Sequence, residues 1–184
     1  IRMFSFYVSE GKSREYKGKV FERLGQFADY AKANNVVLLH ENEKGIYGEK
    51  AAECKEIMDA FGGAHFKAIF DFANFVQADQ DTLDAYELLK EHIAYIHVKD
   101  AIKGTGQVVP AGMGDGYVEA ILKKLYANGF KGYLSLEPHL FNFTGFAGLE
   151  KGDSSIGNGP AKVLSGEEAF ALAHESLQNI LAKM

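Results

Sequence analysis

Four side chains that could bind a metal occupy similar places in four apolar segments of the sequence. These are Glu41 in NVVLLHE, Asp71 in HFKAIFDF, His97 in HIAYIHVKD and Glu137 in GYLSLEP. Three carboxylates and one imidazole directed at a single point would repel one another and raise each other's pKa. A divalent cation would remove this conflict. Carboxylate oxygens with one histidine nitrogen favour Mn²⁺, Mg²⁺ or Co²⁺, with Zn²⁺ as the alternative.

Such a site suits proton transfer at a carbon next to a carbonyl. A hydroxyketone that chelates the cation has an acidified C–H group, because the metal stabilises the enediolate that forms. One carboxylate could remove the proton and a second carboxylate could return it, which would give isomerisation or epimerisation. Glu41 and Glu137 are the candidates for these catalytic roles, and Asp71 and His97 are then chiefly ligands.

The elements that must position these residues alternate along the chain. Apolar segments typical of buried strands cover residues 1–8, 35–41, 65–72, 92–100 and 132–138. Between them, residues 16–33, 81–91 and 116–127 have the apolar spacing of amphipathic helices. This alternation indicates parallel βαβ units with helices covering the sheet.

An open sheet and a closed barrel would place the four candidates differently. Four neighbouring strands of an open sheet spread over roughly 14 Å, whereas an eight-stranded barrel brings its strand ends toward one point. The sequence therefore predicts a TIM (β/α)8 barrel. Because such barrels need about 250 residues, we expect residues 1–184 to be the C-terminal part of a single barrel domain, with the last five strands present.

The amino-acid composition disfavours some kinds of binding partner. The formal net charge of −5 gives no cationic field for nucleic acid, and no apolar run approaches the roughly 20 residues that span a bilayer. A single cysteine, Cys54, excludes an intrachain disulfide and favours a reducing cytoplasm. We expect a soluble cytoplasmic protein, and homo-oligomers would be compatible with its acidic composition.

Residues beside the four candidates have weaker signals. Any single strand-end acid could instead cap a helix or lie in solvent, and only the coincidence of four favours a site. Lys99 and His139 are predicted to contact substrate, with a solvated lysine as the alternative for Lys99. Asp100 is expected to cap the next helix or, less favoured, to orient a ligand histidine. Asn42 and Glu43 fit either the pocket or a turn.

Two long connections, residues 104–116 and 141–166, follow strand ends on the side of the candidate site. Loops of this length are commonly binding loops or disordered segments, and we interpret both as lids. Phe141, Phe143 and Phe146 could form an apolar lid or anchor the second loop.

The motifs LLHENE, IFDFAN, YIHVKD and LSLEPH, in this order, resemble the metal-ligand motifs of the xylose-isomerase-like TIM barrel superfamily, the sugar phosphate isomerase/epimerase family. The resemblance implies a metal-dependent enzyme acting on a small sugar or sugar phosphate. It also implies that Glu41 and Glu137 both hold the metal and exchange protons with substrate. Many relatives have histidine where this chain has Asn74, a substrate-contacting position, and a Gly-Glu-Gly turn where it has Gly112-Met113-Gly114-Asp115.

Other functions stay open. A dehydratase or lyase of the same barrel, similar to inosose dehydratase, shares the proton abstraction and is the main alternative. An AP-endonuclease-like phosphodiesterase is disfavoured, because such sites gather more histidines around a metal cluster. A non-catalytic sugar-binding or scaffold protein is the third class.

Overall fold

The chain forms a parallel half-barrel. The computed structural model describes residues 1–140 and 164–184. Its main sheet has the order β1-β2-β3-β4-β7, with every neighbouring pair parallel. The strands are β1 (Arg2–Met3), β2 (Leu38–Glu41), β3 (Phe66–Asp71), β4 (Ile93–Val98) and β7 (Tyr133–Leu136). A small antiparallel pair, β5 (Asp100–Ala101) and β6 (Val108–Val109), follows β4.

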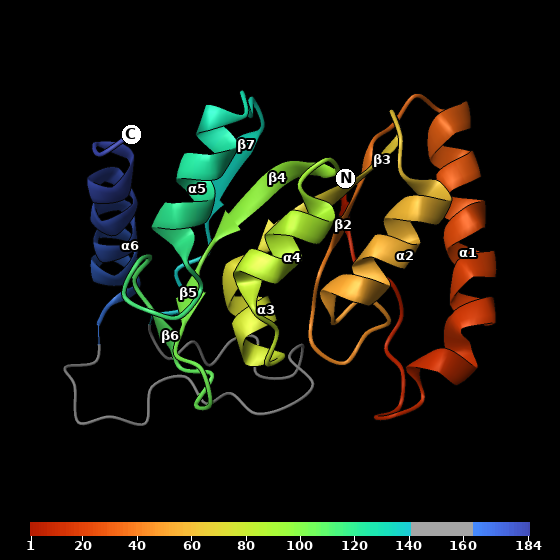
Figure 1. Cartoon of the computed structure of the whole chain (residues 1–184), viewed down its shortest axis with the longest axis horizontal. Helices are drawn as coiled ribbons and strands as arrows, with labels where there is room; N and C mark the ends of the chain where they lie inside the picture. Colours follow the sequence, from red (N-terminus) through yellow and green to blue (C-terminus); the bar gives the residue numbers. More distant parts are fainter. Residues whose placement is uncertain (141–163) are drawn as a thin grey trace.

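Helices succeed one another along the sheet in chain order, from α1 at one end of Figure 1 to α6 at the other. They are α1 (Ser13–Ala33), α2 (Ala51–Phe61), α3 (Phe72–Gln77), α4 (Thr82–Leu89), α5 (Val118–Ala127) and α6 (Gly166–Leu181). The three predicted helices are confirmed to within a few residues at each end. In the described part of the chain, no helix combines the length and apolar character needed to cross a bilayer.

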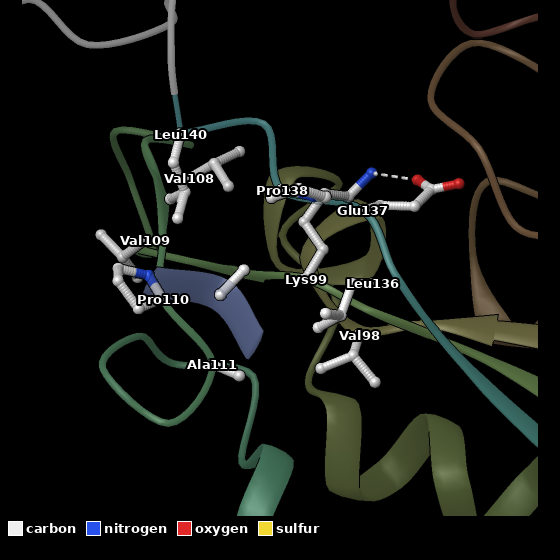
Figure 2. A pocket seen from close by; sticks show the side chains of 11 residues that line it. Val98, Lys99, Val108, Val109, Pro110, Ala111, Leu136, Glu137, Pro138 and Leu140 are labelled. Atoms are coloured by element: carbon white, nitrogen blue, oxygen red, sulfur yellow. Dashed lines mark hydrogen bonds and ion pairs between the residues drawn. The ribbon is translucent and has the colours of Figure 1, made fainter. Parts of the chain in front are cut away.

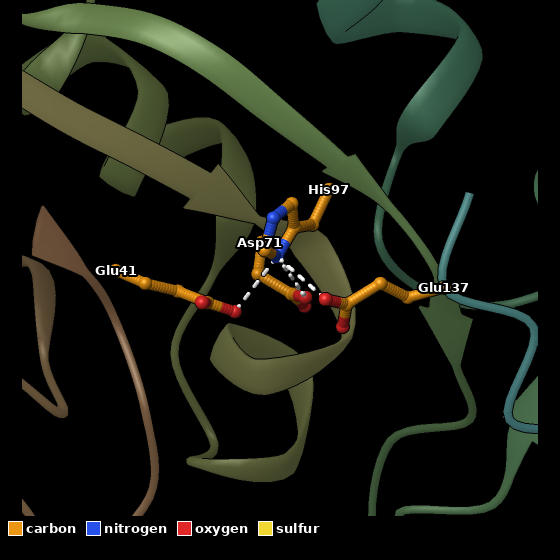
Figure 3. Close-up of side chains that lie close together, drawn as sticks. All are labelled: Glu41, Asp71, His97 and Glu137. Carbon is orange, nitrogen blue, oxygen red and sulfur yellow. Dashed lines mark hydrogen bonds and ion pairs between the residues drawn. The ribbon is translucent and has the colours of Figure 1, made fainter. Parts of the chain in front are cut away.

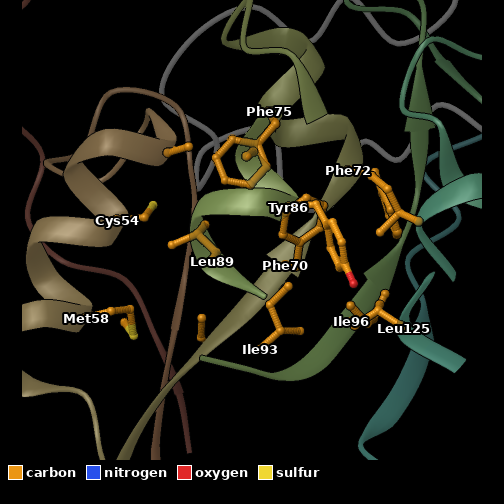
Figure 4. Close-up of a cluster of buried hydrophobic side chains, with 14 of the residues drawn as sticks. Cys54, Met58, Phe70, Phe72, Phe75, Tyr86, Leu89, Ile93, Ile96 and Leu125 are labelled. Carbon is orange, nitrogen blue, oxygen red and sulfur yellow. The ribbon is translucent and has the colours of Figure 1, made fainter. Parts of the chain in front are cut away.

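The core lies between the helices and the sheet. Helix α5 buries Val118, Ile121, Leu122 and Leu125, which share one face at helical spacing. Figure 4 shows the aromatic part of this core, where Phe70 of β3 lies 5.0 Å, between ring centroids, from Phe75 of α3. Close packing of this kind resists displacement, so the end of β3 is held firmly beneath the candidate site.

The first strand differs from its prediction. Only Arg2 and Met3 pair with β2, although residues 1–8 were expected to form the strand. The following backbone groups bond instead to the connection after β2: Val8 N–H donates to the Gly45 carbonyl (2.9 Å) and Tyr47 N–H to the Phe6 carbonyl (3.1 Å). The strand ends because these groups have found other partners.

The structure describes one of the two predicted lids in full and only a small part of the other. The connection 104–116 contains β6, which pairs with β5, so part of this loop is regular structure. Residues 141–163 of the second connection, with Phe141, Phe143 and Phe146, lie outside the described residues. Both lid roles therefore stay predictions at this point.

Candidate metal centre

Strand register brings the four sequence candidates together. Asp71 at the end of β3 pairs with His97 of β4, Glu41 ends β2, and Glu137 directly follows β7. One ligand atom from each of these four residues lies within 4.8 Å of the others. Figure 3 shows Glu41 and Glu137 approaching His97 from opposite sides.

The His97 imidazole is the centre of the cluster. Its Nδ1 lies 2.9 Å from Glu41 Oε1, 3.0 Å from Glu137 Oε1 and 3.8 Å from Asp71 Oδ2. One ring nitrogen carries one proton at most and cannot satisfy three carboxylates. Burial lowers the pKa of His97, but the hydrogen bond and charge of Glu41, together with the charges of Glu137 and Asp71, outweigh burial and the pKa is raised.

Two cations flank the carboxylates. Arg2 Nε of β1 donates to Glu41, and its Nη2 lies 4.0 Å from Glu137 Oε1. Lys99 Nζ lies 3.2 Å from Asp71 Oδ2 and 3.3 Å from Glu137 Oε2. Burial alone would raise the pKa of Glu41, yet the hydrogen bonds of His97 and Arg2 hold it below its usual value.

Burial shifts the pKa of Lys99 downward, whereas it shifts the pKa values of the carboxylates Glu41 and Asp71 upward. Desolvation lowers the pKa of the Lys99 ammonium, but Asp71 and then Glu137 raise it above its ordinary value. The side chain is 5% exposed, so it is a buried charge paired with two carboxylates rather than a solvated lysine. Its predicted contact with substrate remains a prediction.

Asp71 has two distinct oxygen environments. Oδ1 accepts the backbone N–H of Asn74 (2.8 Å) and caps α3. Oδ2 accepts no hydrogen bond of good geometry from residues 1–140 and 164–184, although Lys99 Nζ is near enough for an ion pair. Burial raises the pKa of Asp71 to about 6, partly opposed by Lys99. A fully buried carboxylate oxygen with this free capacity, beside two carboxylates and an imidazole, fits a small divalent cation.

Asn74 lies beside the cluster on α3. Its Nδ2 donates to the Asn42 carbonyl (2.9 Å) and lies 3.4 Å from Glu43 Oε2 and 3.5 Å from Glu41 Oε1. Asn42 in turn exchanges two hydrogen bonds, each of 3.0 Å, with the backbone of Asp71. This buried amide network fixes the end of β2 against the end of β3, so Asn42 has a structural role at this position.

The remaining predicted contact, His139, lies two residues beyond Glu137. It is partly buried, and its backbone N–H donates to the Glu137 carbonyl (2.8 Å). Its substrate role stays a prediction. Arg2 is the site residue that the sequence reasoning missed. A charged residue within the apolar segment IRMFSFYV was the signal that could have found it.

A parallel half-barrel with an acidic cluster at the carboxyl ends of its strands places the chain among the α/β barrel proteins. A family model described as "Xylose isomerase-like TIM barrel" matches residues 3–155. The chain therefore belongs to the xylose isomerase-like TIM barrel family, as its motifs had indicated. No curated protein matches the chain in sequence.

Several solved structures share the fold. One is a xylose isomerase domain protein from Planctomyces limnophilus, with 20% identity and a TM-score of 0.71 over 100% of this chain and 60% of that one. A D-tagatose 3-epimerase-like protein has 18% identity and a TM-score of 0.68, over 98% and 61% of the two chains. The IOLI protein with a bound zinc atom has 15% identity and a TM-score of 0.68, over 99% and 62%. This chain thus spans about three fifths of the length of these structures.

Proposed function

We propose that the chain carries the metal-binding and proton-transfer residues of a sugar or sugar-phosphate isomerase or epimerase. The observation that carries this proposal is the convergence of Glu41, Asp71, His97 and Glu137, whose ligand atoms lie within 4.8 Å of one another. Membership of the xylose isomerase-like family supports it, as does similarity in fold to an epimerase-like protein and to a zinc-containing protein.

A divalent cation held by these four residues would act as a Lewis acid toward the carbonyl and hydroxyl oxygens of a bound sugar. The donor set suits Mn²⁺, Mg²⁺, Co²⁺ or Zn²⁺. Glu41 and Glu137 reach the cluster from opposite sides, so one carboxylate can take a proton from the sugar carbon while the other returns it. The Glu137 side chain is 22% exposed and Glu41 is fully buried, so Glu137 is more accessible to substrate.

Other residues would hold the substrate. Lys99 can stabilise a developing oxyanion, because its ammonium lies at the cluster, 3.2 Å from Asp71 Oδ2 and 3.3 Å from Glu137 Oε2. We assign substrate contacts to His139 and Asn74 as well. For Asn74 the contact would use the side-chain oxygen, because the amide nitrogen faces protein acceptors.

A dehydratase is the alternative that this geometry also supports, because the same carboxylates would abstract the same proton. A phosphodiesterase with a multi-histidine cluster fits less well, since the metal-ligand group found among the described residues contains one histidine. A cytoplasmic location is part of the proposal and is supported by Cys54, a buried free thiol.

Isotope exchange tests the proposal. With Mn²⁺ and a keto-sugar such as D-fructose in D2O, we expect deuterium at the carbon next to the carbonyl, and chelation of the metal should abolish the exchange. Glu137→Gln should reduce the exchange by about 10² to 10⁴-fold, because the amide keeps the shape and removes the base. Glu87→Gln, an exposed change on α4, is the matched control and should exchange like the parent. Catalysed turnover without solvent label, or undiminished exchange in the Glu137 variant, would contradict the proton-transfer mechanism.

A further inference from the structure

The carboxylate of Asp100 is surrounded by backbone N–H groups from the connection that follows it. Oδ1 accepts the N–H groups of Ala101 and Gly116, each at 2.9 Å. Oδ2 accepts those of Gly112 and Gly114, each at 3.0 Å. Asp100 is fully buried. The expected helix cap is therefore wrong, because Asp100 begins strand β5 and its oxygens bind a loop that returns from 12 to 16 residues further along the chain.

The glycines of this loop are required by the close approach of the backbone to the carboxylate. A Cβ at Gly114 would lie 2.5 Å from Asp100 Oδ1 and 2.5 Å from the Ala101 carbonyl oxygen. A Cβ at Gly116 would lie 2.6 Å from the same Oδ1. Gly112 has a φ of +83°, a conformation that favours glycine. Glycine at every second position thus lets the N–H groups of Gly112, Gly114 and Gly116 converge on one side chain.

The anchored loop borders the candidate metal centre. Lys99 immediately precedes Asp100, and Val109 pairs with Asp100 in the β5–β6 ladder. Figure 2 shows a cleft lined by Val109 and Pro110 on one side and by Lys99 and Glu137 on the other. The cleft therefore has an apolar loop wall facing the Lys99–Glu137 ion pair.

We propose that Asp100 is a positioning residue that fastens residues 101–116 as a preformed wall of the substrate pocket, in place of the mobile lid that loop length suggested. The proposal rests on the proposed function only in taking this cleft as part of the substrate pocket. The wall closes one side of the small pocket that the Lys99 side chain also lines, so it limits the access of water to this side chain. An ion pair in a drier site interacts more strongly. An ordered wall also leaves less conformational freedom to be lost when substrate binds.

Amide hydrogen exchange and lysine labelling test the wall without requiring turnover. In the parent chain we expect slow exchange in peptides covering residues 101–116 and slow acetylation of Lys99 by acetic anhydride. Asp100→Asn should raise both rates by about tenfold or more, because hydrogen bonds to a charged acceptor are lost and several N–H groups lose their partner. Asp81→Asn is the matched control. Asp81 caps α4 through the N–H of Asp84, a bond that asparagine retains, so both rates should stay near those of the parent.

A second variant distinguishes local loosening of the loop from a general loss of folding. Gly114→Ala keeps the Asp100 charge but forces the loop away from it, so it should loosen the same peptides and leave those of α2 protected. Fast exchange of residues 101–116 in the parent chain would overturn the proposal, as would unchanged Lys99 labelling in variants whose loop has loosened.

Metal binding and turnover separate this proposal from the proposed function. Mn²⁺ affinity should change by less than about threefold in Asp100→Asn, because the four candidate ligands belong to the strand ends and not to the loop. With D-fructose, kcat/KM should fall by about tenfold or more, because the pocket wall is no longer held. Unchanged kcat/KM in an active protein would overturn the positioning role. If no variant or parent shows turnover, the proposed function fails, and the exchange and labelling results still decide whether the wall exists.

Discussion

Carboxylates occur in two contrasting regions of this molecule, the strand ends and the outer surface of the helices. On α4, the exposed Glu87 carboxylate lies 2.8 Å from Lys90 Nζ and 2.7 Å from Lys124 Nζ. At the strand ends, the Glu41 and Asp71 side chains are fully buried and converge with Glu137 on a single histidine nitrogen. The helical carboxylate is compensated by lysines and water, whereas the strand-end carboxylates share a small number of buried donors.

The difference shows where the fold has concentrated buried charge. A surface pair adds little stability and is easily replaced. Bringing several carboxylates together in a buried place is costly even when cations accompany them, and one oxygen here, Oδ2 of Asp71, accepts no hydrogen bond from the described residues. This is the kind of place where functional sites are found more often than on a helical surface. The helices cover the sheet, and the strand ends are where we propose that the chemistry takes place.

Replacing Glu41 should have the largest effect on metal binding. Changes to the groups that orient metal ligands commonly cost 10 to 100-fold in affinity, so Glu41→Gln, which alters a proposed ligand itself, should weaken Mn²⁺ binding by at least about 100-fold. It also removes the negative charge that Arg2 and His97 contact on this side, and Glu137 remains as their other carboxylate neighbour. Isothermal titration with Mn²⁺ measures the change. An affinity equal to that of the parent would remove Glu41 from the metal centre.

The pH dependence of metal binding should follow Asp71 and His97. Because the pKa of Asp71 is raised to about 6 and that of His97 is raised above its ordinary value of 6.5, Mn²⁺ binding at low pH must displace a proton from each of these proposed ligands. The affinity should fall by at least about tenfold for each pH unit below 6, and titrations in buffers of different ionisation enthalpy should detect the released protons. Affinity that is constant between pH 7 and pH 5 would show that Asp71 is already ionised in the metal-free protein.

The stability of the metal-free chain provides an independent test of the raised pKa of Asp71. Between pH 4 and pH 6 the unfolded chain would lose the proton of Asp71, whose ordinary pKa is 3.8, while the folded chain retains it. The contribution of Asp71 to the free energy of unfolding should therefore fall as the pH rises through that window, and it should level off above it. Urea unfolding of Asp71→Asn, which cannot titrate, should lack this component.

Replacing Glu87 should have the smallest effect. Glu87→Gln removes a carboxylate that water can replace, so the melting temperature should stay within about 2–4 °C of the parent and Mn²⁺ affinity should be unchanged. Differential scanning calorimetry and Mn²⁺ titration provide the two measurements. A large loss of metal affinity here would mean that the helical surface and the strand ends are coupled, and the contrast between the regions would no longer hold.

Sequence reasoning succeeded where the information was local. Glu41 and Asp71 lie at the ends of β2 and β3, as the apolar segments predicted, and the alternation of strand and helix patterns predicted the parallel strands. The predicted extent of β1 was less accurate, because the hydrogen bonds of residues 6–8 to residues 45–47 depend on a loop that no strand pattern describes. Arg2 was missed for a similar reason. Its ion pair with Glu41 depends on the register in which Arg2 pairs with Leu39.

The residue types and their places at the ends of four strands can be read from the sequence, because side-chain chemistry and strand alternation are properties of neighbouring residues. The folded structure sets the pKa of Asp71 above its ordinary value and the pKa of Glu41 below its ordinary value. It also sets the role of Asp100, which holds a loop instead of capping a helix. Those outcomes depend on which donors arrive from elsewhere in the chain. Arg2 comes to Glu41 from 39 residues away and Gly114 to Asp100 from 14 residues away, and such distances are closed only when the strands pair and the core packs.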